Sequence, residues 1–292
     1  MEIHGAHGYL IDQFFWDQIN LRADEYGGSL QNRMRLLVEI IDAIRLELPR
    51  SFPIIVRLDG EEINIKNGLT STESIQIAKS IESKVDAIHV SSYANPASGA
   101  HFTKAPLNHK KEGFVKVTSL IRDAVKIPII AVGRIDPDRA DNYISQGKFN
   151  FLAMGRKLLA DPDLPKKLMK NEPKTIKPCH YSYECVSRIF LNGQMVCASD
   201  VGLGKKEKEH SIKNLAIIGA GPAGLELAVQ AANRKIHVSL YEKQSFIGGN
   251  LIGAAIIYEP YEKLLNYYQD SIKNDFIDVH FNKEIELDDV HD

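Results

Sequence analysis

Met1-Glu-Ile-His-Gly-Ala-His-Gly-Tyr9 reads as the end of a strand that leads directly into two imidazoles and one phenol. Ligands of parallel α/β proteins bind at the carboxyl ends of the strands, so we expect His4, His7 and Tyr9 to face a ligand. Hydrogen-bond donors and a phenolic proton source suit a reaction that polarises a carbonyl group and delivers a proton.

The segments that follow repeat a unit of strand and helix. Short apolar runs predict strands at residues 1–4, 54–58, 87–91, 129–132 and 149–154. Apolar residues at helical spacing predict helices at residues 33–48, 71–83 and 114–125. Repeated units of this kind indicate an α/β fold with a parallel sheet or a barrel.

A second α/β unit is predicted near residue 213, where a strand at 215–218 leads into Gly219-Ala-Gly221-Pro-Ala-Gly224. In this dinucleotide fingerprint Gly219 makes the tight turn, and Gly221 lets the backbone approach a pyrophosphate. Gly224 allows close packing of the following helix, residues 225–233, on the strand. Glu242 follows the next predicted strand, residues 237–241, where a carboxylate can accept from ribose hydroxyls. The pattern predicts a dinucleotide site.

Arginines stand at the ends of three predicted strands of the first unit. Arg57 closes one strand, and the pairs Gly133-Arg134 and Gly155-Arg156 close the last two. Glycine exposes backbone N–H groups and arginine supplies charge, as in the phosphate site after the seventh and eighth strands of a (β/α) barrel. We therefore predict a phosphate site there.

The three cysteines of the chain, Cys179, Cys185 and Cys197, all fall in one short segment. Their clustering favours a metal over a disulfide. An iron–sulfur cluster normally needs four thiolates, and a zinc site with help from His180 is equally open. Three free thiols in a loop is the remaining alternative.

Composition describes an ordinary globular protein. The 292 residues are 44% hydrophobic and 25% charged with a formal net charge of −2, so roughly two domains are expected and neither nucleic acid nor a membrane is an expected partner. No apolar run reaches the roughly 18–20 residues that span a bilayer, and no signal peptide is recognisable, so a cytoplasmic location is expected. We predict one domain at residues 1–170, a linker with the cysteines at 171–212 and a second domain at 213–292.

Two stretches resemble the old yellow enzyme family of FMN oxidoreductases. They are His4-Gly-Ala-His-Gly-Tyr-Leu-Ile-Asp-Gln-Phe14 and Arg22-Ala-Asp-Glu-Tyr-Gly-Gly-Ser-Leu-Gln-Asn-Arg33. The stretch at residues 155–165, the cysteine segment and the dinucleotide fold are similar to the long branch with 2,4-dienoyl-CoA reductase, enoate reductases, trimethylamine dehydrogenase and bile-acid-converting NADH:flavin oxidoreductases. The resemblance implies a TIM (β/α)8 barrel with FMN, a 4Fe-4S cluster on the cysteines, and later domains for FAD and NAD(P)H.

The resemblance also implies roles for individual residues. His4 and His7 would bind the substrate carbonyl oxygen or lie near the flavin, and Tyr9 would donate the proton. Arg57 would lie at the N1/O2 edge of the flavin. The phosphate of FMN would bind the two Gly-Arg pairs, and His101 resembles a second active-site acid of dienoyl-CoA reductases.

The chain departs from the family pattern in three respects. It resembles the family from about barrel strand four onward, so we expect a partial barrel of about strands 4–8. Of the family's C-x2-C-x3-C-x11-C pattern it keeps the x11 interval, but Ser182 stands near the place of the second cysteine. A cluster would lack one of its four thiolates. The dinucleotide domain resembles an incomplete FAD domain, so we expect an internal piece of a longer enzyme.

We therefore expect part of an enzyme that reduces an activated C=C bond with electrons from NAD(P)H through FAD and a cluster to FMN. Its substrate would be a small enone, enoate or enoyl-CoA, and other chains could supply the barrel strands and the NAD(P)H domain. Two alternatives are a non-catalytic remnant that binds at most a nucleotide or a partner chain, and an amine dehydrogenase similar to trimethylamine dehydrogenase.

Overall fold

The computed structural model describes residues 1–63, 65, 67–94, 111–205 and 211–286. Compact packing divides the chain into two units, Met1–Met154 and Gly155–Asp292. Each unit has its own sheet and its own hydrophobic core. The three-part division into residues 1–170, 171–212 and 213–292 stays a prediction.

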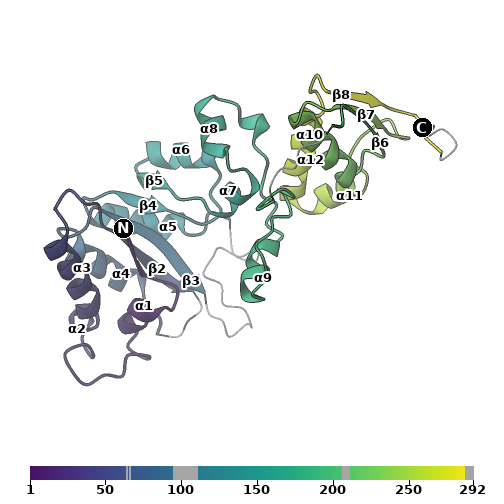
Figure 1. The fold of residues 1–292 in the computed structure, drawn as a ribbon. Helices are drawn as coiled ribbons and strands as arrows, with labels where there is room; N and C mark the ends of the chain where they lie inside the picture. Colours follow the sequence, from purple (N-terminus) through teal and green to yellow (C-terminus); the bar gives the residue numbers. More distant parts are fainter. Residues whose placement is uncertain (64, 66, 95–110, 206–210, 287–292) are drawn as a thin grey trace. The chain divides into compact units, whose positions relative to one another are not determined.

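The first unit is built on a five-stranded parallel sheet whose strands follow the order of the chain (Figure 1). This order is that of consecutive strands in a (β/α) barrel, and it confirms the expected α/β fold with a parallel sheet. The strands are β1 (Glu2–Gly5), β2 (Ile55–Ile63), β3 (Ala87–Ala94), β4 (Ile129–Ala131) and β5 (Phe151–Leu152).

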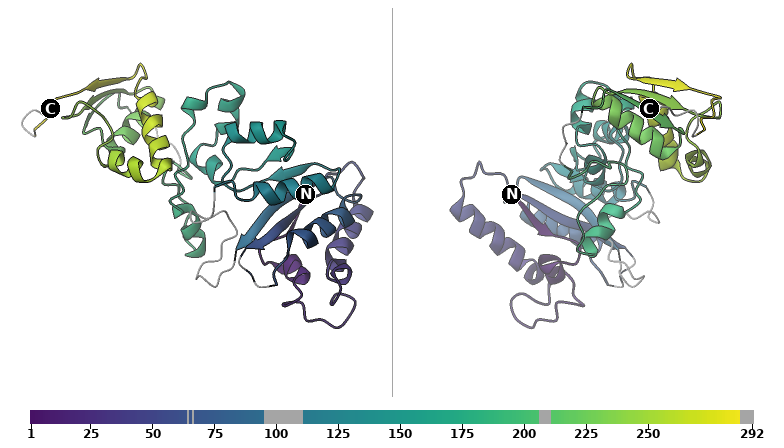
Figure 2. Two further views of the ribbon diagram at one scale, coloured as in Figure 1. Left: turned by 180° about the vertical axis from the view of Figure 1, so that it is seen from behind. Right: turned by 45° about the vertical axis from the view of Figure 1, so that its right-hand side comes forward.

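Helices connect these strands. They are α1 (Leu10–Phe15), α2 (Leu30–Arg33), α3 (Arg35–Glu47), α4 (Ser71–Ile81), α5 (Val115–Ala124) and α6 (Pro137–Ser145). The start of α4 is fixed by a capping box, in which Thr70 and Glu73 satisfy each other's backbone N–H groups. The apolar sides of α3, α4 and α5 share one buried cluster with the sheet, and Figure 2 shows these helices from two further directions.

The two faces of the first sheet differ in chemistry. Alternate strand residues enter the core shared with the helices, namely Ile3, Val56, Leu58, Ile88 and Val90. Residues at the intervening positions, among them His4, Arg57 and His89, lie on the opposite face because side chains alternate along a strand. Two of the polar residues predicted at strand ends, His4 and Arg57, therefore share one face of the sheet.

The second unit begins with short helices, of which the last carries Cys185, while Cys179 and Cys197 lie in the segments before and after it. The short helices are α7 (Arg156–Ala160), α8 (Leu164–Met169), the 3-10 turn η2 (Pro173–Thr175) and α9 (Glu184–Phe190). The Rossmann-like part follows as β6 (Asn214–Ile218), α10 (Pro222–Asn233), β7 (His237–Tyr241), α11 (Asn250–Ile257), α12 (Glu259–Ser271) and β8 (Ile277–His280). Its three strands are parallel, in the order β6-β7-β8.

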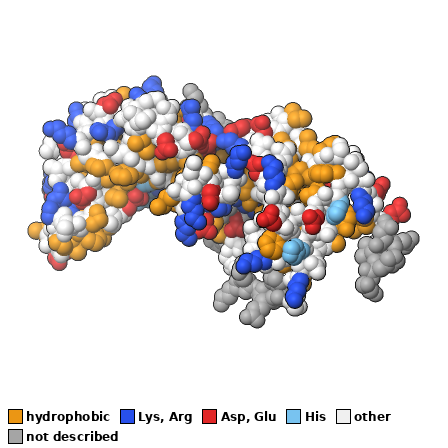
Figure 3. Space-filling view, turned by 90° about the horizontal axis from the view of Figure 1, so that it is seen from above, with side chains coloured by type: hydrophobic (Ala, Val, Ile, Leu, Met, Phe, Trp, Pro, Cys, Tyr) orange, Lys and Arg blue, Asp and Glu red, His pale blue; other side chains and the backbone are white. Residues whose placement is uncertain are grey.

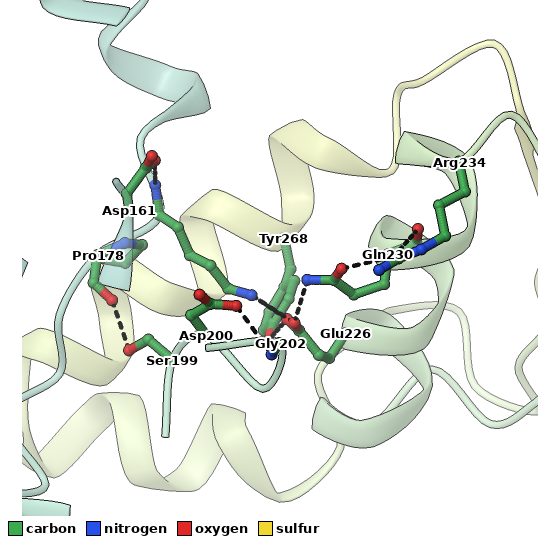
Figure 4. Close-up of polar contacts among 10 residues, drawn as sticks. Asp161, Pro178, Ser199, Asp200, Gly202, Glu226, Gln230, Arg234 and Tyr268 are labelled. Carbon is green, nitrogen blue, oxygen red and sulfur yellow. Dashed lines mark hydrogen bonds and ion pairs between the residues drawn. The ribbon is translucent and has the colours of Figure 1, made fainter. Parts of the chain in front are cut away.

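A buried ion pair joins the cysteine segment to the Rossmann-like part within this unit. Lys177 Nζ lies 2.5 and 2.6 Å from the two carboxylate oxygens of Glu226 on α10 (Figure 4). The Tyr268 hydroxyl donates to the same carboxylate at 2.9 Å. Burial raises the pKa of Tyr268, and the Glu226 charge raises it further. The hydroxyl therefore stays protonated and remains a donor.

Several predicted boundaries need correction. β2 continues to Ile63 instead of ending at residue 58, and β3 continues to Ala94 instead of ending at residue 91. β5 is shorter than the predicted 149–154. α10 begins at Pro222 instead of residue 225, because proline is favoured in the first turn of a helix, where its missing N–H has no helical partner.

The surface and the helices agree with the composition. Lysine and arginine side chains are interspersed with aspartate and glutamate over the face shown in Figure 3. No helix in the described part of the chain is both long and apolar enough to cross a membrane.

Candidate active site

The register of the first sheet places His4, Arg57 and His89 side by side on β1, β2 and β3. Nδ1 of His89 lies 2.9 Å from Oε2 of Glu2, so the imidazole of His89 contacts a carboxylate of β1. Burial, followed by the charge of Arg57, lowers the pKa of both His4 and His89. Both rings are therefore neutral at pH 7, when each has one N–H to donate.

The loop after β1 brings the other two predicted residues to this row. The His7 ring lies 5.0 Å from the His4 ring, and the Tyr9 ring lies 5.4 Å from it, both as centroid distances. His7 is 8% exposed, whereas Tyr9 is 58% exposed and stands at the N-terminus of α1. The predicted trio is thus brought together, with the phenol at the accessible side.

Ser91 on β3 joins two of the predicted residues. Its Oγ lies 2.7 Å from Nε2 of His7 and accepts from Nη2 of Arg57 at 3.3 Å. Sequence reasoning missed Ser91 because serine has no distinctive spacing, although it closes a predicted strand beside the one that ends in Arg57. Burial lowers the pKa of Arg57, but an arginine keeps its charge at any ordinary pH.

Three carboxyl groups that sequence reasoning also missed lie behind this loop. Asp12, Asp59 and Glu62 are buried, and each offers an oxygen within 4.8 Å of the others. Asp59 Oδ2 accepts the backbone N–H of His7 at 2.6 Å. One signal was present in the sequence, since Asp59 follows Arg57 by two positions and so shares its face of β2.

The two Gly-Arg pairs lie in different units. Gly133, with φ of 109°, adopts a backbone conformation that favours glycine, and it lies with Arg134 after β4 in the first unit. Gly155 and Arg156 begin the second unit, where Arg156 lies 4.9 and 4.7 Å from the ring centroids of Tyr181 and Tyr183. The phosphate site formed by the two pairs together stays a prediction.

The glycine turn has the shape of a nucleotide site. A Cβ on Gly224 would lie 2.0 Å from the carbonyl oxygen of Gly219, so only glycine fits there. A Cβ on Gly221 would meet no atom within 4 Å, which leaves space for a ligand beside the backbone. Glu242 Oε2 accepts the backbone N–H of Ala220 at 2.8 Å and so lies against the turn.

The cysteines do not form a compact metal site in the described residues. Cys179, Cys185 and Cys197 are free thiols of intermediate exposure. The acidic group behind His7 is the one set of three possible ligand atoms that lie within 4.8 Å of one another in the part of the chain searched. Burial raises the pKa of Cys179, which favours the thiol over the thiolate that metals bind. His101 lies outside the described residues.

Comparisons with known proteins identify the family of each part of the chain. Residues 1–175 match the family described as NADH:flavin oxidoreductase / NADH oxidase, and residues 217–265 match the NAD(P)-binding Rossmann-like domain.

Two curated relatives and one solved structure extend this match. NADH oxidase of Thermoanaerobacter brockii is 36% identical over 86% of the chain and 40% of its own length. Cinnamate reductase of Clostridium sporogenes is 31% identical over 97% of the chain and 46% of its own length. A structure of 2-naphthoyl-CoA reductase superposes with a TM-score of 0.90 at 29% identity, over 99% of this chain and 45% of that one. The chain thus spans less than half the length of each of these proteins.

Proposed function

The chain belongs to the NADH:flavin oxidoreductase / NADH oxidase family, and we propose that its first unit binds FMN and reduces an activated C=C bond. The substrate we propose is a small enone, enoate or enoyl-CoA. The names of two similar proteins, cinnamate reductase and 2-naphthoyl-CoA reductase, support this class of substrate.

The observation that carries the proposal is the convergence of His4, His7 and Tyr9 beside Arg57. Two imidazoles can donate hydrogen bonds to one carbonyl oxygen and so polarise the conjugated C=C bond. The exposed Tyr9 hydroxyl can then donate a proton to the substrate carbon. This division of roles needs an accessible Tyr9, and the exposure of its side chain supports it.

The residues around Arg57 fit the flavin. Nε of Arg57 is buried and has no hydrogen-bond partner in the described residues. A buried donor without a partner is costly, so an acceptor from a bound group is expected there. Arg57 would hold the flavin ring through this group and stabilise negative charge on it. When bound, FMN supplies the hydride that adds to the C=C bond.

We propose that the second unit binds FAD, with the ADP portion of the cofactor at the turn from Gly219 to Gly224. The space beside Gly221 and the carboxylate of Glu242 fit a pyrophosphate and a ribose. In this proposal NAD(P)H is the source of electrons. A 4Fe-4S cluster fits less well, because the segment offers only three of the four thiolates, with Ser182 near the place of the second cysteine.

Tyr9→Phe tests the proposed chemistry. The full chain is loaded with FMN, the flavin is reduced photochemically so that no NAD(P)H domain is needed, and trans-cinnamate or an enone is added without oxygen. We expect reoxidation of the flavin by the substrate to slow by about 100-fold in Tyr9→Phe, with photoreduction unchanged. The control is Tyr26→Phe, a tyrosine whose hydroxyl donates to Glu39. Equal loss of both half-reactions, or no reoxidation in the unsubstituted chain, would contradict the proposal.

Two further expectations are part of the same proposal. On the basis of the sequence, we place the protein in the cytoplasm. We also expect partner chains for any barrel strands or NAD(P)H module that this chain does not supply.

A further inference from the structure

The buried carboxyl groups of Asp12, Asp59 and Glu62 stand directly behind the candidate active site. Asp12 lies on α1, and the other two lie on β2. Asp12 and Asp59 have no exposed surface, and Glu62 is 8% exposed. Three carboxylates in so small a buried space would repel one another strongly, so the group must hold protons or a cation.

Two of these carboxyl groups bind consecutive backbone N–H groups of the loop after β1. Asp59 Oδ2 accepts from the His7 N–H at 2.6 Å, and Asp12 Oδ2 accepts from the Gly8 N–H at 2.7 Å. His7 has a φ of 66°, a conformation that a residue other than glycine adopts only when its surroundings hold it there. The two carboxyl groups are therefore well placed to hold it.

One carboxyl oxygen of Asp12 lies within 4.8 Å of one of Asp59, and Oδ1 of each residue is buried with no hydrogen-bond partner in the described residues. Two ionised carboxylates have no hydrogen to donate to each other, so a proton on one of them would supply the missing donor. The backbone N–H of Leu69 donates to Oε2 of Glu62 at 2.7 Å, and Oε1 of Glu62 is buried without a partner in the described residues. A proton on one of the three groups would reduce the negative charge in this space.

The charges that face the group favour retention of protons. Arg57 is the cation whose charge lowers the pKa of Asp59, whereas Asp12 and Glu62 raise it and Glu73 on α4 raises that of Glu62. Burial, the largest cause, raises the pKa of Asp12 to about 7 and that of Glu62 to about 9. Burial also raises the pKa of Asp59 well above its ordinary value.

We propose that Asp12 and Asp59 share a proton and, as a pair, position the segment from His7 to Tyr9. The claim that this segment is catalytic rests on the function proposed above, but the shared proton does not. Asp12 and Asp59 are thus positioning residues, because they act through the backbone of His7 and Gly8 and not on the substrate.

The first test follows the amide protons of His7 and Gly8 by NMR in the full chain without flavin, since each donates to one carboxyl group. We expect the chemical shifts of both amide protons to change with a midpoint above pH 5. The Asp12→Asn substitution removes a negative charge beside Asp59, so it should move the midpoint for the His7 amide to lower pH. Asp17→Asn, at an exposed position, is the control and should leave the midpoint unchanged. An unchanged midpoint in Asp12→Asn would overturn the proposal.

The second test compares Asp59→Asn with Asp59→Ala. Asparagine keeps an oxygen for the His7 N–H, so hydrogen exchange at this amide should stay within about twofold of the unsubstituted chain, whereas alanine should accelerate it at least about tenfold. Equal exchange in both variants would contradict the positioning role. If Asp59→Ala does not fold, the Asp12→Asn midpoint still decides the question of the shared proton.

A third measurement separates a proton from a metal ion. Millimolar Ca²⁺ or Mn²⁺ at pH 7 should leave the His7 and Gly8 amide signals unchanged. A saturable change would show that the three carboxyl groups bind a cation, and it would overturn the proposal. Because none of these readouts uses flavin, a failure of FMN binding and a failure of proton sharing are distinct results.

Discussion

The Ser91 hydroxyl lies 2.7 Å from Nε2 of His7, so a side chain of β3 contacts the loop that follows β1. The same hydroxyl accepts from Arg57 at 3.3 Å. One buried group therefore links the imidazole that we assign to the substrate with the guanidinium that we assign to the flavin.

Ser91→Ala should lower the free energy of unfolding of the first unit by about 1–3 kcal/mol, because it leaves an N–H of Arg57 and Nε2 of His7 without their common hydrogen-bond partner. Urea unfolding measures the change. Ser92→Ala is a matched control, since the neighbouring Ser92 hydroxyl is buried and has no partner in the described residues. That substitution should be neutral or stabilising, and a larger loss in Ser92→Ala than in Ser91→Ala would refute the assigned contact.

Gly224→Ala should destabilise the second unit by roughly 1–3 kcal/mol or more, because the new Cβ would lie 2.0 Å from the Gly219 carbonyl oxygen. Gly253→Ala is the control, since it lies within α11 and its Cβ would meet no atom within 4 Å. There we expect a gain of about 0.5–1 kcal/mol from the higher helix propensity of alanine. Thermal unfolding compares the two variants, and equal effects would show that the turn is not as tight as described.

Lys177→Met should cost about 3–5 kcal/mol of stability, because it leaves the Glu226 carboxylate buried without its cation. Adding Glu226→Leu to the same chain should recover most of the loss, since the isolated buried charge is then removed as well. A double-mutant cycle by denaturant unfolding measures this coupling. Additive losses from the two substitutions would indicate that the pair does not form.

His89→Gln should change the dependence of stability on pH. Burial lowers the pKa of His89 in the folded chain. As the pH falls below about 6.5, His89 therefore binds a proton in the unfolded chain before it does so in the folded chain. The unsubstituted chain should therefore lose stability relative to His89→Gln between pH 7.5 and pH 5. A constant difference between His89→Gln and the parent at all pH values would argue against a buried neutral ring.

Local sequence patterns were sufficient to predict much of the fold. The helix at 71–83 and the strand at 237–241 were recognisable because the spacing of apolar residues and the capping and turn residues are local properties. The His4, His7 and Tyr9 trio was also predictable, since all three belong to one strand end and the loop that follows it.

Contacts that depend on strand register or on packing of distant segments could not be predicted in this way. The Asp59 contact with the His7 N–H joins residues 52 positions apart, and the Lys177 pair with Glu226 joins residues 49 positions apart. No local periodicity signals either contact. The strand β8 and the helices α11 and α12 were likewise not predicted, and the role suggested for His101 stays a prediction outside the described residues.

The most direct test of the account is the binding of FMN to the full chain, followed by the change in the flavin absorption spectrum. We predict saturable binding of one FMN per chain with a perturbed spectrum, and a loss of that perturbation in Arg57→Leu with the fold retained. An identical spectrum and affinity in Arg57→Leu, or no binding by the unsubstituted chain, would contradict the claim that this polar face of the first sheet holds the flavin.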